Sequence, residues 1–153
     1  MEKLLRLSIV TLVVMTIATV ACADNVQDGI DRLKNGNKDI REEAAEYLGS
    51  VGAGNQAVQS ALIEAMTDPV GDVRESAAKA LGKVGDTDAV PVLIRALKDD
   101  DFGVRNAAVK ALGSVGDERA VDPLQEVAAN AWNPFVSKEA SKSIMQIKAR
   151  TGN

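Results

Sequence analysis

A pattern of about 32 residues recurs four times along this chain. The two middle copies read VRESAAKALGKVGD and VRNAAVKALGSVGD, the first copy reads IREEAAEYLGSVGA, and the last is the degenerate VSKEASKSIMQIKA. Arg41, Arg74, Arg105 and Ser137 hold the equivalent position and are separated by 33, 31 and 32 residues. A fixed period of this length is typical of a solenoid, in which each unit covers its apolar surface with its neighbours.

Each repeat is predicted to contain two helices. The first helices are expected at approximately 26–34, 58–66, 91–98 and 123–130, and Pro91 and Pro123 suit a first helical turn, where no N–H is needed. In the second segment of the second copy, apolar residues fall at helical spacing, at Val73, Ala77, Ala80, Leu81 and Val84.

Residues at both ends of the second helices predict where these helices begin and end. Asp39 and Asp72 stand just before two of them, where a carboxylate can accept hydrogen bonds from free backbone N–H groups. Gly85 and Gly116 follow two of them, where a left-handed glycine would close a helix.

Three short motifs carry a family resemblance. The patterns D-V-R at 72–74, A-A-x-A-L-G at 77–82 and G-D-x-x-A-V-x-P at 116–123 resemble HEAT repeats, and in particular the HEAT-like repeats first named from phycobilisome bilin lyases. The resemblance covers about 130 residues. It implies an all-α fold, a right-handed α-α superhelix of about four helix pairs in an armadillo-like arrangement. Such arrays serve many binding roles, so the motif specifies the fold rather than the function.

The repeats divide the chain into an N-terminal segment, 1–23, and a HEAT-like domain, 24–153, with units at approximately 24–54, 55–86, 87–117 and 118–153. The resemblance also implies that each arginine of the Arg41 column pairs with an acidic turn residue of an adjacent unit. Asp39, Asp72 and Asp101 are the candidate partners, and direct contact of the arginines with a ligand is the alternative.

Small and apolar residues at recurring positions predict how the units pack. Ala44, Ala77 and Ala107, with Gly49, Gly82 and Gly113, would allow helices to approach closely. Leu48, Leu81, Leu112 and Met145 are expected to form one continuous core ladder. The last copy is polar, and we expect it to cap the stack with Ser137, Lys138, Ser141, Lys142, Ser143 and Gln146.

Residues 1–23 are predicted to be an export signal. Lys3 and Arg6 precede an uncharged run over 7–23, which ends in small residues, as in a secretory signal peptide. Cleavage after Ala23 would give a secreted protein. The lipobox-like sequence before Cys22 would instead give a lipoprotein with a lipid on Cys22, and the uncleaved run would be an anchor. All three alternatives place the repeats outside the cytoplasm, in the periplasm or beyond.

Composition excludes several classes of site. The chain has no histidine and one cysteine, so Ser-His or Cys-His catalysis and Cys/His zinc sites are ruled out. Its net charge of −4 disfavours nucleic acid as a partner. The Asp run at 99–101 lacks the spacing of a calcium loop and is interpreted as a solvated turn. We therefore predict no catalytic, cofactor-binding or metal-binding residue.

Two features are candidates for binding. Lys79, Lys110 and Lys142 fall in one column of the second helices and could face an acidic protein partner, or could simply form a solvated face. Trp132 and Phe135 form an aromatic cluster that could anchor a partner or plug the end of the core. The sequence thus predicts a non-catalytic extracytoplasmic interaction or scaffold module. An enzyme-associated subunit like the bilin lyases and a lipid-anchored envelope spacer are the alternatives.

Overall fold

The structure, a computed structural model, describes residues 25–130 and 133–152, which form helices and turns and include no strand. Residues 25–35 are helical and supply the first helix of the first repeat. The remaining helices are α2 (Lys38–Val51), α3 (Gln56–Ala65), α4 (Gly71–Val84), η1 (Thr87–Ala89), α5 (Val90–Ala96), α6 (Phe102–Val115), η2 (Glu118–Ala120), α7 (Val121–Asn130) and α8 (Pro134–Thr151). The predicted all-α fold is confirmed.

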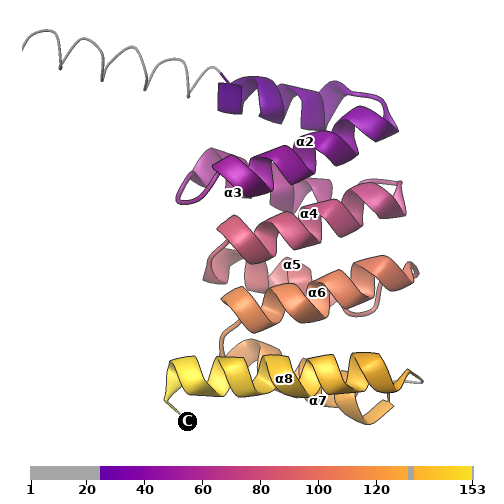
Figure 1. The fold of residues 1–153 in the computed structure, drawn as a ribbon, viewed down its shortest axis with the longest axis vertical. Coiled ribbons are helices and arrows are strands. Elements are labelled where there is room, and N and C mark those ends of the chain that lie inside the picture. Colours follow the sequence, from indigo (N-terminus) through magenta and orange to yellow (C-terminus); the bar gives the residue numbers. More distant parts are fainter. Residues whose placement is uncertain (1–24, 131–132, 153) are drawn as a thin grey trace, which may run out of the picture.

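The helix pairs stack along one axis, from the N-terminal to the C-terminal unit (Figure 1). The second helices of consecutive repeats contact each other, α2 with α4, α4 with α6 and α6 with α8. The first helices α3, α5 and α7 each pack on the second helix of their own repeat. The second helices therefore form one continuous layer, and α5 and α7 lie behind it in this view.

Side chains in the turns set where most of these helices begin. The Asn37 side chain accepts from the Ile40 N–H at 3.0 Å, and Asp101 accepts from the Gly103 N–H at 2.7 Å. The prediction that Asp39 and Asp72 precede their helices is wrong, since both lie in the first turn. There a carboxylate still interacts favourably with the helix dipole.

The glycines after α4 and α6 end these helices in a different way from the one predicted. Gly85 has φ −73° and ψ 168°, and Gly116 has φ −64° and ψ 154°, so both are extended rather than left-handed. Each still donates its N–H to the last turn, to Leu81 and Leu112 respectively. A Cβ at either position would collide with that same carbonyl oxygen, which is why glycine stands there.

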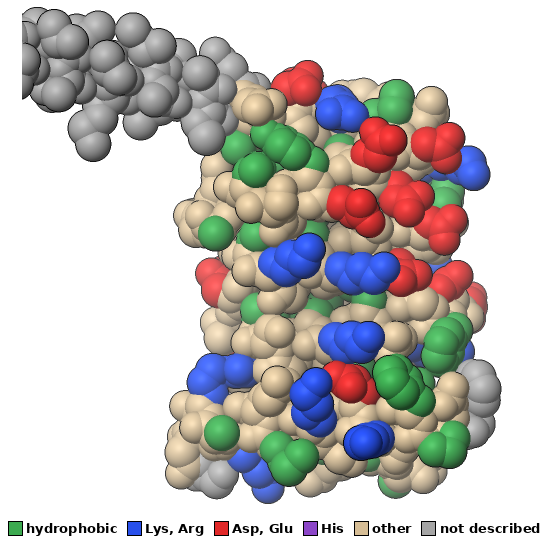
Figure 2. All heavy atoms as spheres, viewed as in Figure 1, with side chains coloured by type: hydrophobic (Ala, Val, Ile, Leu, Met, Phe, Trp, Pro, Cys, Tyr) green, Lys and Arg blue, Asp and Glu red, His purple; other side chains and the backbone are tan. Residues whose placement is uncertain are grey.

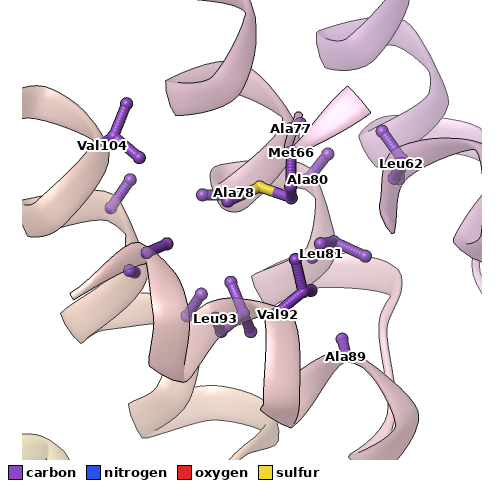
Figure 3. Packing of buried hydrophobic residues seen from close by; sticks show 14 of the residues in the cluster. Leu62, Met66, Ala77, Ala78, Ala80, Leu81, Ala89, Val92, Leu93 and Val104 are labelled. Atoms are coloured by element: carbon purple, nitrogen blue, oxygen red, sulfur yellow. The ribbon is translucent and has the colours of Figure 1, made fainter. Parts of the chain in front are cut away.

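The core runs through all the repeats, with side chains of α3, α4, α5 and α6 meeting in it (Figure 3). Leu48, Leu81 and Leu112 are fully buried, as predicted. Met145 is 64% exposed, so its assignment to this ladder is wrong. Ile147, two residues further along α8, is fully buried.

The register of α8 explains the exposure of Met145. Ser143 contacts Gly113 as Ala111 contacts Gly82 one repeat earlier. Ile144 therefore holds the position equivalent to Leu81 and Leu112. Met145 is one residue later and faces solvent. Ser143 is itself buried and donates to the Val109 carbonyl at 2.9 Å, so it does not belong to the polar outer face predicted for the cap.

The small residues lie where neighbouring second helices are closest. A Cβ built on Gly49 would be 2.8 Å from the Ala80 Cβ, and one on Gly82 would be 3.0 Å from the Ala111 Cα. Backbone and methyl groups fill that space, so any side chain there would push the helices apart. The predicted close approach of these helices is confirmed.

Candidate binding surfaces

Arginine and aspartate join consecutive repeats. The Arg41 Nε and Nη2 donate to the two carboxylate oxygens of Asp68 at 2.6 and 3.0 Å. Arg74 holds Asp99 in the same way, at 2.8 and 2.7 Å. Each arginine lies on a second helix and each aspartate in the turn before the next second helix. Bidentate hydrogen bonds of this kind fix the relative orientation of the two side chains and also strengthen the ion pair.

These contacts keep both carboxylates ionised. Burial alone would raise the pKa of Asp68, but the hydrogen bonds from Arg41 and from the Val70 N–H lower it below its ordinary value. The hydrogen bonds from Arg74 lower the pKa of Asp99 and outweigh its burial. The Arg41 and Arg74 pKa values are raised by the same pairs.

The partners differ from those predicted. Asp39, Asp72 and Asp101 do not pair with the column, although pairing across units is confirmed. The paired carboxylates stand six residues before the arginine of their own repeat, at Asp68 and Asp99. The run at 99–101 is also more than a solvated turn, because Asp99 holds Arg74 and Asp101 caps α6.

In the described part of the chain, Arg105, the third arginine of the column, does not pair with an aspartate of the next repeat as Arg41 and Arg74 do. Its Nη1 donates to the backbone carbonyls of Asp99 and Asp100 at 2.6 and 2.8 Å, and its guanidinium carbon lies 5.8 Å from the centre of the Phe102 ring. In residues 25–130 and 133–152, no carboxylate accepts from its Nε or Nη2. The position equivalent to Asp68 and Asp99 in the fourth repeat is Ala131, which has no acidic group.

The lysine column lies along one face of the second helices. Lys79 and Lys110 line a hollow of about 210 Å³, and Lys110 and Lys142 line the next, of about 380 Å³. Lys79 pairs with Glu75 at 2.6 Å and Lys142 with Glu139 at 3.2 Å, and both lysines stay about half exposed. On this face Asp and Glu side chains gather toward the N-terminal units and Lys and Arg toward the C-terminal ones (Figure 2).

Phe135 joins this surface. Its ring is 55% exposed, lies 5.8 Å from the Lys110 Nζ and lines the second of the two hollows. Trp132 lies outside the described residues, so its role as plug or anchor stays a prediction. The structure therefore brings Phe135 together with Lys110 and Lys142, a neighbourhood that the sequence alone did not indicate.

An apolar pocket of about 290 Å³ opens between the third and fourth repeats. It is lined mainly by hydrophobic side chains of α5, α6 and α7 and the start of α8, with Arg105 among them. It shares no lining residue with either lysine hollow. The sequence did not indicate this pocket, because nothing in the repeat pattern distinguishes its apolar lining residues from residues of a continuous core.

The described residues contain no cluster of three or more acidic or cysteine side chains that could hold a metal ion. In the same part of the chain, no helix is long and apolar enough to cross a bilayer. Cys22 and the predicted export signal lie outside the described residues.

Comparison with known proteins decides the family. The family described as HEAT repeats matches residues 11–82 and 60–145, which together cover most of the chain. The chain belongs to the HEAT repeat family. The first match begins inside the segment predicted to be an export signal.

Two further proteins resemble this HEAT-repeat chain. The phycocyanobilin lyase subunit alpha of a Picosynechococcus species is 41% identical over 68 residues, which is 44% of this chain. That match spans only 25% of the lyase subunit. The crystal structure of an engineered protein superposes with a TM-score of 0.64 at 23% identity, over 87% of this chain and 66% of that one. The second likeness supports the fold alone.

The HEAT-repeat sequence held one signal that would have located the ion pairs. Aspartate recurs six residues before Arg74 and Arg105, whereas Asn35 and Ala131 take that position in the first and last units. An acidic residue confined to the two middle turns indicates pairing with the preceding arginine. It also marks Arg105 as the arginine for which the next unit has no acidic residue at the equivalent position.

Proposed function

We propose that this HEAT-repeat chain is a non-catalytic binding module that docks an acidic protein segment along its second-helix face, outside the cytoplasm. HEAT repeats suggest an interaction or scaffold role, and the second helices of this chain form one uninterrupted layer. The partner's acidic side chains would lie over Lys79, Lys110 and Lys142. An apolar side chain of the partner would pack on Phe135.

The observation that carries this proposal is the state of Lys110. It sits between two lysines of the same column and lines both hollows. Lys79 and Lys142 each pair with a glutamate on their own helix, whereas no ion pair within the described residues engages Lys110. Its Nζ lies over an exposed aromatic ring. A lysine against an exposed ring offers a partner both charge complementarity and apolar area.

Affinity capture from envelope extracts tests this surface. The wild-type chain is compared with the double variant Lys79→Glu, Lys110→Glu, and captured proteins are identified and then titrated in purified form. The double variant should lose a partner that the wild type binds, at an unchanged melting temperature. The matched control is Lys38→Glu with Lys148→Glu, which makes the same charge change at exposed lysines outside both hollows. Equal binding by all three proteins would contradict the proposal.

The extracytoplasmic location rests on the N-terminal sequence. Lys3 and Arg6 before an apolar run support export, and Cys22 is placed where a lipid would be attached. Metabolic labelling with a fatty acid that is lost in Cys22→Ser would support the lipoprotein. Absence of label with the mature chain in the periplasm would favour simple secretion. Recovery of the chain only from the cytosol would contradict export.

A lyase-like or enzyme-associated role is the second candidate, favoured by the 41% identity with the phycocyanobilin lyase subunit. It is testable by mixing the purified chain with phycocyanobilin and recording the absorption spectrum. A spectral shift that saturates at one bilin per chain would support this candidate over the binding module. An unchanged spectrum would argue against it.

A further inference from the structure

The first two junctions between repeats show what the arginine column binds. Arg41 and Arg74 each direct Nε and Nη2 to the two oxygens of one carboxylate, at 2.6 to 3.0 Å. In both pairs the remaining Nη1 donates to a backbone carbonyl, that of Gly36 or Asp68. The fork is thus held by backbone on one side and filled by a carboxylate on the other.

Arg105 keeps half of this arrangement at the third junction. Its Nη1 donates to the carbonyls of Asp99 and Asp100, as the earlier arginines donate to theirs. In the part of the chain that the structure describes, all its hydrogen bonds come from Nη1, and none comes from Nε or Nη2. The side chain is only partly buried, so these donors remain within reach of an incoming group.

An apolar pocket adjoins this incomplete fork. Arg105 lines a pocket of about 290 Å³ together with hydrophobic residues. These include Ile94, Leu97, Phe102, Val109, Val127 and Val136. At the rim Lys98 and Glu126 face each other at 3.7 Å, so the glutamate charge is partly offset. Mostly apolar walls with a few placed polar groups are typical of ligand sites, and this volume is at the small end of their range.

The equivalent hollow at the first junction differs in one respect that matters. It contains Arg41 together with Asp68 and Pro69 of the next turn, so the chain itself fills the fork. At the third junction Arg105 instead lines a pocket whose walls are mostly hydrophobic.

We propose that the pocket at Arg105 binds the carboxy-terminal residue of a partner polypeptide, when that residue is large and apolar. The terminal carboxylate takes the place that Asp68 and Asp99 hold at the other junctions, on Nε and Nη2 of Arg105. The terminal side chain enters the apolar pocket. A single bulky side chain suits a pocket of this small volume. This site shares no residue with the lysine surface, so either can fail without the other.

Titration of the full chain with three probes tests the site. The probes are a tetrapeptide ending in a free carboxy-terminal phenylalanine, the same peptide with a terminal amide, and N-acetylphenylalanine. The peptide acid should bind measurably at about millimolar concentration or below, and the amide about tenfold or more weakly, because it lacks the charge that the fork binds. N-acetylphenylalanine should bind less tightly than the peptide acid.

Two variants locate binding at this pocket. Arg105→Lys keeps the charge but loses the two-donor fork. It should weaken the binding of the peptide acid by about tenfold and leave the binding of the amide unchanged. Val127→Phe should fill the pocket and weaken both peptides. Arg95→Lys is the matched control, since Arg95 is exposed and outside the pocket lining. Circular dichroism and melting temperature establish that each variant is folded.

The proposal is overturned if no probe binds, if acid and amide bind equally, or if Arg105→Lys binds the acid as wild type does. Binding of N-acetylphenylalanine as tightly as the peptide acid would overturn the proposal that the ligand is a polypeptide. It would indicate a small apolar acid as the ligand instead. Loss of binding in Val127→Phe with retention in Arg95→Lys would support the site.

Discussion

The Arg74 guanidinium in α4 holds both carboxylate oxygens of Asp99, with Nε to Oδ2 at 2.8 Å and Nη2 to Oδ1 at 2.7 Å. Its Nη1 donates to the Asp68 carbonyl at 2.8 Å. One side chain therefore ties the turn of its own repeat to the turn of the next. The side chains of Arg74 and Asp99 are only 17% and 15% exposed, so solvent screens the pair less than a surface ion pair.

Removing this arginine is expected to destabilise the stack. Arg74→Ala should lower the free energy of unfolding by about 2–3 kcal/mol, because it leaves the mostly buried Asp99 carboxylate without its partner. Arg74→Lys should cost less, since it keeps the charge but not the fork. Urea unfolding followed by circular dichroism measures both. The control Arg95→Ala, at an exposed position, should change stability by about 0.5 kcal/mol or less. Equal stability of the two alanine variants would show that the joint is dispensable.

The same pair should make stability depend on pH in a defined direction. The hydrogen bonds from Arg74, which outweigh burial, place the pKa of Asp99 in the folded protein below its ordinary value of about 3.9. The stability it contributes is therefore present above about pH 4 and is lost as pH falls through the lowered folded pKa. The difference in unfolding free energy between wild type and Asp99→Asn should be largest at neutral pH and shrink at about pH 3. A difference that stays constant across this range would contradict the assignment.

Close helix packing predicts unequal costs for adding one methyl group. Gly49→Ala would place a Cβ 2.8 Å from the Ala80 Cβ and 2.9 Å from its Cα, and backbone cannot rotate away. We expect this substitution to lower the free energy of unfolding by about 1–3 kcal/mol, despite the higher helix propensity of alanine. At Gly113 the three nearest atoms all belong to side chains, and the nearest is the Oε1 of the exposed Gln146, which can rotate away, so Gly113→Ala should lower the stability less. Thermal melts of the two variants compare them, and a greater loss at Gly113 would refute this explanation.

The sequence predicts the architecture because the repeat is a strong periodic signal. A fixed spacing of the Arg41 column, together with buried leucines at equivalent positions, is enough to place two helices per unit and stack the units. The details of helix ends were less predictable. Asp72 would precede α4 only if this helix began two residues later than it does, and assigned helix boundaries generally differ by one or two residues.

The candidate surfaces were predicted only in part. The lysine column follows from alignment of the repeats, but the position of Phe135 beside Lys110 depends on how the turn before α8 meets α6. The pocket at Arg105 could not be predicted, because apolar residues such as Val109 and Val127 fit a core stripe as well as a pocket wall. The one sign in the sequence that the third junction differs is an alanine, Ala131, at the position where Asp68 and Asp99 stand in the other repeats.

The leucine column gives a last prediction that separates the core from its apparent continuation in α8. Leu81 and Leu112 are fully buried, so Leu81→Ala and Leu112→Ala should each lower the free energy of unfolding by about 2–5 kcal/mol, through lost burial and the cavity left behind. Ile147, also fully buried, should behave in the same way, whereas Met145→Ala should be nearly neutral because Met145 is 64% exposed.

Chemical unfolding of the four variants at one pH measures these costs. In a stack, each unit is stabilised by its neighbours, so the loss at Leu81, inside the array, should destabilise both adjacent repeats. The loss at Ile147, in the last unit, should preferentially release the C-terminal end, which amide hydrogen exchange would detect as faster exchange confined to α7 and α8. Unchanged stability of both leucine variants, or a cost at Met145 equal to that at Ile147, would mean that the repeats do not share the core described here, because burial alone distinguishes these four positions.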